Sequence, residues 1–191
     1  MMILDRLRKD HANMLQLLRT LEWQLAEFEV GNQPDYDVLL AAVDYFLMFP
    51  ELSHHPTEDL IFEKLRERAP ISAQSIGDLR SAHDALAARA RVLAEGLRAV
   101  LAEAEVPREA FVRWCSEFID NQRQHIEMEE ATFFPAVEKT LTEKDWRDLG
   151  AKIVKRIDPL FDLNVDEKFK QLRQTILAWQ RQDEALRASQ T

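Results

Sequence analysis

The sequence is poor in cysteine, glycine and proline. Its single cysteine, Cys115, excludes a disulfide within the chain and argues against a site built from several thiolates, such as a structural zinc or iron–sulfur site. So few thiols suit a reducing compartment. Four glycines and seven prolines leave few points at which a helix must end, while Ala, Leu, Glu, Gln, Arg and Lys predominate. This composition predicts an all-helical fold.

Long apolar runs and an excess of positive charge are also missing. The first ten residues contain no stretch that resembles a signal peptide, and no segment approaches the length of a membrane span. We therefore expect a soluble, cytoplasmic protein that has no membrane partner. A formal net charge of −9 and a pI near 5.1 disfavour nucleic acid as a partner, because phosphate binding needs a basic face. The same acidity is compatible with cations.

The apolar residues that are present recur at the spacing of amphipathic helices. Four long helices are expected within residues 1–139, as an up-down-up-down four-helix bundle, with two additional C-terminal helices in an extension over residues 140–191. The expected ranges are about 3–28, 36–68 with an interruption, 72 or 75 to 103, 107–139, 142–157 and 165–187.

Two prolines fall within the second expected helix. Pro50 and Pro56 would each remove a helical hydrogen bond, so we expect a kink or short break at residues 50–53. Ser53 would then cap the restarted helix, since proline is tolerated in a first turn. Asp35 is the expected cap at the start of this segment, and Thr142 begins a capping sequence further along the chain.

One pattern occurs twice. His54-x-x-x-Glu58 is repeated as His125-x-x-x-Glu129, and both members are offset by 71 residues (54 to 125 and 58 to 129). Residues four apart lie on one face of a helix, so each pair can contact the same metal ion or a bridged pair of ions. In each half another histidine precedes the pair, His11 in the first and His83 in the second. Packed about a pseudo-twofold axis, the two helical hairpins would bring these residues to one level of the core.

Burying four imidazoles and two carboxylates at one level requires compensation. Each unpaired polar group costs about 1–3 kcal/mol, and an unpaired charge costs more. A hydrogen-bonded His/Glu network without metal is one alternative. Bound cations are the other, and this ligand set suits two ions that each take two histidines and share both glutamates. Iron is the favoured metal, with manganese or zinc as alternatives, and open positions would remain for water, an oxo or hydroxo bridge, or a small gas.

This series of histidines and glutamates resembles the hemerythrin-like (HHE cation-binding) family over about Met1 to Lys139, and its order is similar to that of bacterial four-His, two-Glu members. The resemblance implies two non-haem irons. Oxygen-carrying members have a fifth histidine one turn from the position of His83, where this chain has Leu79 and Ala87. The function implied is therefore binding or sensing of O2, NO or peroxide, or iron handling in oxidative or nitrosative stress. The residues implied as terminal ligands are His11, His54, His83 and His125, with Glu58 and Glu129 as bridges.

Several assignments stay open at this point. His55 and Asp59 are also four apart; the repeat favours His54 with Glu58 and leaves His55 as a possible additional ligand. Three acids, Asp59, Glu127 and Glu130, are either solvated charges or partners of the ligand imidazoles. Three phenylalanines, Phe62, Phe133 and Phe134, belong to the core and could form a dry wall around the metals. Cys115 is expected to be a buried apolar residue, and Tyr36 and Tyr45 cannot be placed relative to the metals. Peroxide or NO reduction, a metal-free helical interaction module, and a homodimer through the C-terminal helices are the functional alternatives.

Overall fold

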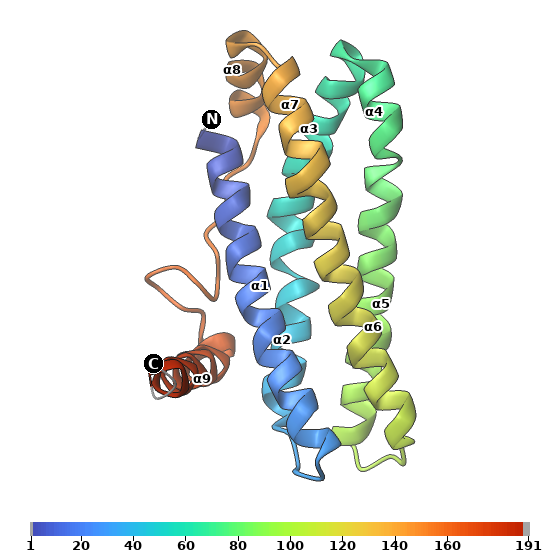
Figure 1. Ribbon diagram of the computed structural model, residues 1–191, viewed down its shortest axis with the longest axis vertical. Helices are drawn as coiled ribbons and strands as arrows, with labels where there is room; N and C mark the ends of the chain where they lie inside the picture. Colours follow the sequence, from blue (N-terminus) through green and yellow to red (C-terminus); the bar gives the residue numbers. More distant parts are fainter. Residues whose placement is uncertain (1, 189–191) are drawn as a thin grey trace.

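The computed structural model describes residues 2–188, with side chains described through residue 182. Four antiparallel rods form an up-down-up-down bundle (Figure 1). They are formed by α1 (Met2–Glu29), α2 with α3 (Tyr36–Phe46 and His55–Arg68), α5 (Leu79–Leu101), and α6 with α7 (Arg108–Met128 and Phe134–Thr140). The predicted all-helical bundle is confirmed. None of the helices within residues 2–188 combines the length and the apolarity of a membrane span.

The buried apolar side chains form two clusters along the bundle. One includes Leu18, Val43 and Phe118, and the other includes Leu7 and Phe133. Each fully buried side chain of this size contributes about 1.5–3 kcal/mol. The buried histidines and glutamates occupy positions between these clusters along the four rods, so the polar site has apolar packing on both sides.

Capping residues account for several helix boundaries. Asp35 accepts a hydrogen bond from the backbone N–H of Val38 at 3.1 Å, as expected. The third long helix differs from the prediction, because residues 70–76 form a separate short helix, α4 (Pro70–Ile76). Gly77, at φ +93°, then turns the chain. Asp78 caps α5 through the N–H of Ser81 at 3.1 Å, so the long helix begins several residues later than predicted.

The second long helix is interrupted at the predicted residues 50–53, but the predicted cap at Ser53 is wrong. The chain continues from α2 into α3 through a π-helical turn, Pro50–His54, in which the N–H of His55 donates to the carbonyl of Pro50. Ser53 does not cap a helix there; its carbonyl accepts the hydroxyl of Thr57 at 2.7 Å. A proline lacks an N–H and its ring collides with the carbonyl four residues back, and a wider turn just before Pro56 accommodates both effects.

A second π-helical turn, Glu129–Phe133, joins α6 to α7. It also directly precedes a helix with proline in its first turn, here Pro135, and the N–H of Phe134 donates to the carbonyl of Glu129. π-helical turns are uncommon and frequently mark functional sites. In this chain each lies beside one of the two His-x-x-x-Glu pairs.

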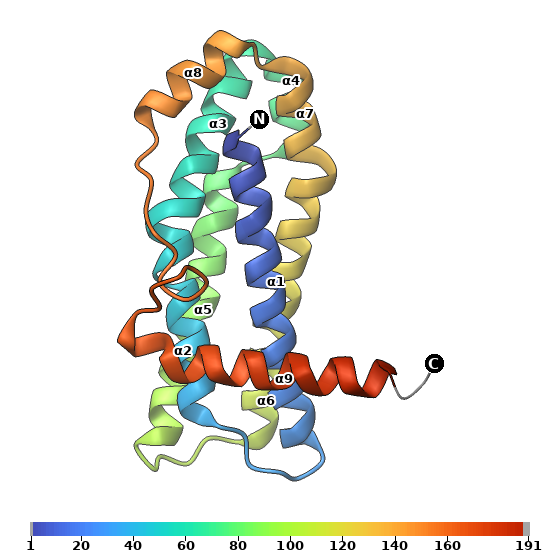
Figure 2. The same cartoon turned by 90° about the vertical axis from the view of Figure 1, so that its left-hand side faces the viewer.

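The C-terminal segment returns along the outside of the bundle. Thr142 and Asp145 form the predicted capping box of α8 (Glu143–Lys152), which ends earlier than the predicted residue 157. Residues 153–166 then run beside the bundle without a regular helix. After a short 3-10 turn, Glu167–Phe169, α9 (Lys170–Ala188) crosses the outer faces of α1 and α2 (Figure 2). It buries Leu172 and Ile176 in the same core cluster as the bundle residues.

Candidate metal centre

The structure brings the six residues of the predicted metal site together from the four rods of the bundle. Within each His-x-x-x-Glu pair the side chains meet as helical neighbours. His54 Nε2 lies 3.1 Å from Glu58 Oε1, and His125 Nε2 lies 3.1 Å from Glu129 Oε1. None of the six side chains is more than 7% exposed; they are His11, His54, Glu58, His83, His125 and Glu129.

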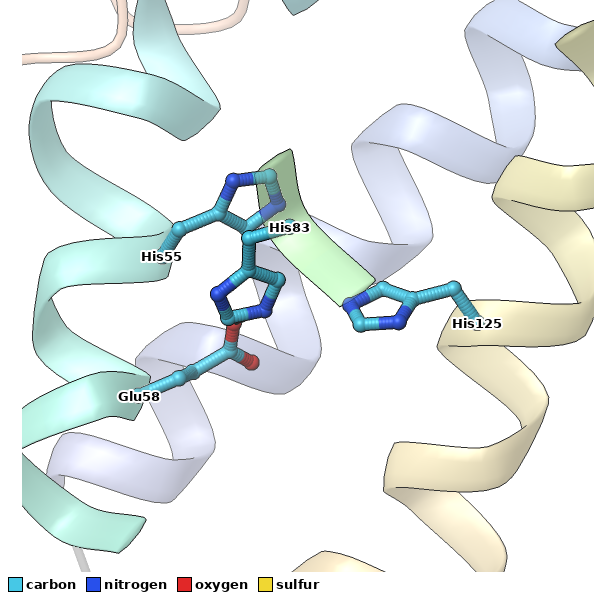
Figure 3. Close-up of side chains that lie close together, drawn as sticks. All are labelled: His55, Glu58, His83 and His125. Carbon is cyan, nitrogen blue, oxygen red and sulfur yellow. Dashed lines mark ion pairs between the residues drawn. The ribbon is translucent and has the colours of Figure 1, made fainter. Parts of the chain in front are cut away.

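The potential ligand atoms divide into two groups. One comprises His11, His54, Glu58 and Glu129, and the other comprises His55, Glu58, His83 and His125; within each group the ligand atoms lie within 4.8 Å of one another. Figure 3 shows the second group, with the ring of His83 between the ring of His55 and the Glu58 carboxylate. Two such groups that share a carboxylate could hold two metal ions.

Both glutamates span the two groups. Glu58 directs Oε1 toward His11 and His54, at 3.6 and 3.1 Å, and Oε2 toward His83 at 3.5 Å. Glu129 directs Oε2 toward His11 at 3.2 Å and Oε1 toward His83 at 3.5 Å. Each carboxylate therefore presents one oxygen to each group, which is the arrangement that a bridging ligand requires.

His55 is the site residue that the sequence left open. Its ring stacks on that of His83 with centroids 3.9 Å apart and planes 7° apart, and it is buried. His54 is the last residue of the π-helical turn and His55 follows it directly. Each of the two histidines belongs to a different ligand group. An ideal α-helix with His54 facing directly inward would have turned His55 away. In the sequence, the two consecutive histidines before Pro56 were the feature that could have indicated His55 as a site residue.

Carboxylates hold the outer nitrogens of four of the histidines. The Nδ1 atoms lie 2.7–3.3 Å from a carboxylate oxygen, which fixes each ring with Nε2 facing inward. The pairs are His11 with Glu130 at 2.7 Å, His54 with Asp10 at 3.3 Å, His55 with Glu51 at 2.9 Å and His83 with Asp59 at 3.2 Å. Of the acids considered from the sequence, Asp59 and Glu130 contact histidines and Glu127 is exposed. Asp10 and Glu51 were not predicted.

The inward-facing atoms lack hydrogen-bond partners. Among the described side chains, the buried nitrogens and oxygens without a partner include Nε2 of His11, His83 and His125 and both oxygens of Glu58 and Glu129. Leaving so many buried groups unpaired would cost several kcal/mol, since each costs about 1–3 kcal/mol. Metal ions bound between them would satisfy these atoms, so the residues present fit a pair of cations.

The pKa values of the site residues also show that the two buried carboxylates favour positive charge beside them. Burial alone would lower the pKa of His11, but attraction to the nearby Glu129 and Glu58 carboxylates outweighs burial and raises the pKa to about 10. Burial would also lower the pKa of His83, but the hydrogen bond to Asp59 and the nearby Glu129 carboxylate raise it to about 9. Burial and the charge of Glu129 would raise the pKa of Glu58, yet the surrounding histidines lower it to about 2. Without metal, protons on the imidazoles offset the buried carboxylates.

Aromatic residues close the site on its apolar sides. Phe134 stacks on His11 with centroids 5.3 Å apart, and Phe133, fully buried, lies against Phe62 with centroids 6.0 Å apart. Cys115 lies in the other core cluster, where burial raises the pKa of its thiol to about 12. It is therefore a buried apolar residue rather than a nucleophile.

A surface cleft approaches the site from one side. It has a volume of about 790 Å³ and its lining includes Asp59, Phe62 and Arg80, beside the junction of α3, α4 and α5. Asp59 also contacts His83, so one lining residue of the cleft is the outer partner of a site histidine.

The comparison with known proteins agrees with this geometry. The family model of the hemerythrin HHE cation binding domain matches residues 2–137, a span that contains all seven site residues and ends before the C-terminal segment. No curated protein and no solved structure matches the chain significantly. The match covers more than half of the chain, and the chain therefore belongs to the hemerythrin HHE cation-binding family.

Proposed function

We propose that this chain is a non-haem di-iron protein that binds or senses O2, NO or peroxide, or handles iron under oxidative or nitrosative stress in the cytoplasm. The observation that carries the proposal is the pair of buried ligand groups that share Glu58 and Glu129. A single tetrahedral ion would use only about half of these donors. Two ions use five imidazoles and both carboxylates.

The ligand chemistry favours iron. Imidazole together with carboxylate suits iron, manganese and zinc, and histidines combined with a carboxylate and open positions are typical of non-haem Fe(II) sites. Iron would supply one-electron redox chemistry, which manganese could share and zinc could not. The two carboxylates leave room for an oxo or hydroxo bridge between the ions.

The two groups offer unequal numbers of donors. The group with His11 and His54 supplies two imidazoles and two carboxylate oxygens, whereas the group with His55 supplies three imidazoles and two oxygens. For an ion that prefers six ligands, the first group leaves more open positions. We therefore propose that a diatomic ligand or peroxide binds on the side of His11 and His54.

His55 also changes the argument about oxygen. The absence of a histidine beside His83 on the third helix pointed away from the oxygen carriers of the family. Because His55 supplies a fifth imidazole from the second rod and stacks on His83, that absence no longer argues against O2 binding. Catalytic reduction of peroxide or NO at the same site is the alternative, and repeated turnover by the reduced protein would favour it.

The remaining alternatives have less support. A metal-free helical module does not explain the unpartnered buried atoms of the site. A homodimer through the C-terminal helices stays a proposal. Several apolar residues of the last helix that could form such an interface are instead buried against the rest of the chain. Phe169, Leu172 and Ile176 are fully buried, while Trp179 is partly buried.

Replacement of His125 by Ala tests the site directly. The change removes one of three imidazoles from one ligand group, so we expect fewer than two irons per chain and an altered ferric absorption spectrum. Gln124→Ala, at the neighbouring exposed position, is the matched control and should keep both irons. Two irons and an unaltered spectrum in His125→Ala would show that the ligand assignment is wrong.

A further inference from the structure

Tyr45, on α2, is a fully buried tyrosine outside the metal site. Its hydroxyl donates a hydrogen bond to Asp158 Oδ2 at 3.1 Å, and Asp158 belongs to the C-terminal segment. The chain has one other tyrosine, Tyr36, which is partly buried at the start of the same helix. A buried phenol hydrogen-bonded to a carboxylate is well placed to lose an electron and a proton together.

Asp158 connects the hydroxyl of Tyr45 to the part of α1 that carries His11. Asp158 Oδ2 is also 3.4 Å from Asn13 Nδ2. Asn13 follows His11 by two residues, which corresponds to about 3 Å along a helix axis. Asp10, one turn earlier on α1, holds Nδ1 of His54 at 3.3 Å. The same stretch of α1 therefore contacts site histidines and the carboxylate partner of Tyr45.

The surroundings of the ring exclude water and stabilise the protonated phenol. Phe49 stacks on Tyr45 with centroids 5.7 Å apart, and Phe46, Phe161 and Phe169 present their edges at 5.9–6.0 Å. Burial first, and then the charge of Asp158, raises the pKa of Tyr45 well above its usual value. The phenol accordingly keeps its proton and donates the hydrogen bond in the resting protein.

We propose that Tyr45 donates one electron to the metal pair after two equivalents of hydrogen peroxide have oxidised that pair beyond the diferric state, each peroxide taking up two electrons and being reduced to water. This inference rests on the proposed di-iron function. The O–H bond of Tyr45 breaks, its proton passes to the Asp158 carboxylate, and its electron reduces the oxidised metal pair by one equivalent. The products are a neutral phenoxyl radical and a carboxylic acid, so charge and atoms balance. An external one-electron reductant then restores the phenol as the proton returns.

The C-terminal segment supplies the proton acceptor. Asp158 Oδ1 accepts the backbone N–H groups of Leu160 and Phe161, both at 2.9 Å, which leaves Oδ2 for Tyr45 and Asn13. Residue 158 lies outside the span matched by the family model, which ends at 137. The electron donor thus comes from the bundle and its proton acceptor from the extension, which gives residues 140–191 a role at the metal site.

Electron paramagnetic resonance of the full-length, iron-loaded protein tests the inference. Ferrous protein is mixed with an excess of hydrogen peroxide, frozen within seconds and examined for a radical, in parallel with protein grown on ring-deuterated tyrosine. We expect a tyrosyl signal in the wild type and in the matched control Tyr36→Phe, and at least a tenfold loss in Tyr45→Phe. Asp158→Asn keeps an acceptor that takes up protons poorly, so its radical yield should also fall.

Iron content, ferric absorption and circular dichroism of the same samples separate the possible failures. Normal iron loading and oxidation with no wild-type radical overturns the role of Tyr45 and leaves the di-iron function intact. A signal that survives in Tyr45→Phe, or that deuteration of tyrosine does not narrow, also overturns it. A wild-type protein that binds no iron overturns both proposals.

Discussion

At the scale of single residues, the site is determined as much by its outer carboxylates as by its inward-facing atoms. Four acids hold Nδ1 of four histidines and so fix Nε2 toward the two ligand groups. Fixing the tautomer and the ring orientation in advance lowers the cost of ordering the ligands when metal binds. The acids themselves stay outside the two groups.

Asp59→Asn should weaken metal binding without removing a ligand. The change weakens the hydrogen bond to His83 Nδ1, and losses of such partners typically cost about 10–100-fold in metal affinity. Competition with a chelator measures the effect. Glu63→Gln is the control, because Glu63 is a partly exposed residue of the same helix that pairs with Arg66, and this variant should bind metal as the wild type does. Equal affinities in the two variants would contradict the role assigned to Asp59.

The metal-free protein should lose stability as the pH rises above about 6.5 and as it falls below about 4.5. His11 and His83 have pKa values raised from 6.5 to about 10 and about 9, so their stabilisation is present below 6.5 and is lost as the pH rises through 9 and 10. Glu58 has a pKa lowered from 4.5 to about 2, so its contribution is lost as the pH falls from 4.5 toward 2. Chemical unfolding across pH measures this profile; metal-free protein that gains stability from pH 6.5 to 10 would contradict it.

The sequence predicted the residues that its repeat related and missed those that depend on local geometry. His11, His54, Glu58, His83, His125 and Glu129 follow from helical spacing and internal offset. Asp10 could not be assigned, because its contact with His54 joins two helices. Glu51 precedes His55 by four residues, and it would have been found had His55 been placed inside the site.

At the scale of helices, the two π-helical turns explain why the site differs from an ideal bundle. Each lies next to a His-x-x-x-Glu pair and just before a helix that carries proline in its first turn. Asp35 and Thr142 caps were predictable because a side chain bonds to a backbone N–H within three residues. The π-helical form of the turn at residues 50–54 was not predictable, because a proline is compatible with either a break in the helix or a wider turn.

Two glycines in helices should respond to alanine in opposite directions. A Cβ on Gly96 would lie 2.7 Å from the ring of Trp114, so Gly96→Ala forces α5 and α6 apart and should lower the free energy of unfolding by about 1–2 kcal/mol. At Gly150 on α8 the nearest atom, from Ile3, is 4.0 Å away. Gly150→Ala should stabilise the protein by about 0.5–1 kcal/mol. Denaturant unfolding of both variants measures this, and equal shifts would contradict the close contact of α5 and α6.

At the scale of the whole molecule, the C-terminal segment packs onto the bundle that holds the metal site. The α9 helix crosses α1 and α2, and its buried residues share a core cluster with bundle residues (Figure 2). Asp158 adds a polar connection to Tyr45 and Asn13. Sequence alone indicated an amphipathic last helix but not its partner, because an apolar stripe does not specify the surface that covers it.

Adjacent residues of α9 provide a test of this packing. Ile176 is fully buried and Leu177 is 37% exposed. Ile176→Ala should lower the free energy of unfolding by about 2–5 kcal/mol, whereas Leu177→Ala should change it by about 0.5 kcal/mol or less. Thermal and denaturant unfolding of the two variants measures the difference. Similar small losses in both would show that α9 does not pack on the bundle.

The central claim is that the buried histidines and glutamates hold two irons. Its most direct test is elemental analysis of the purified protein from iron-supplemented cells, combined with absorption spectra of the reduced protein before and after exposure to air. We predict two irons per chain and a ferric absorption band that develops in air. A fully helical protein that contains no iron and remains colourless in air would contradict the claim.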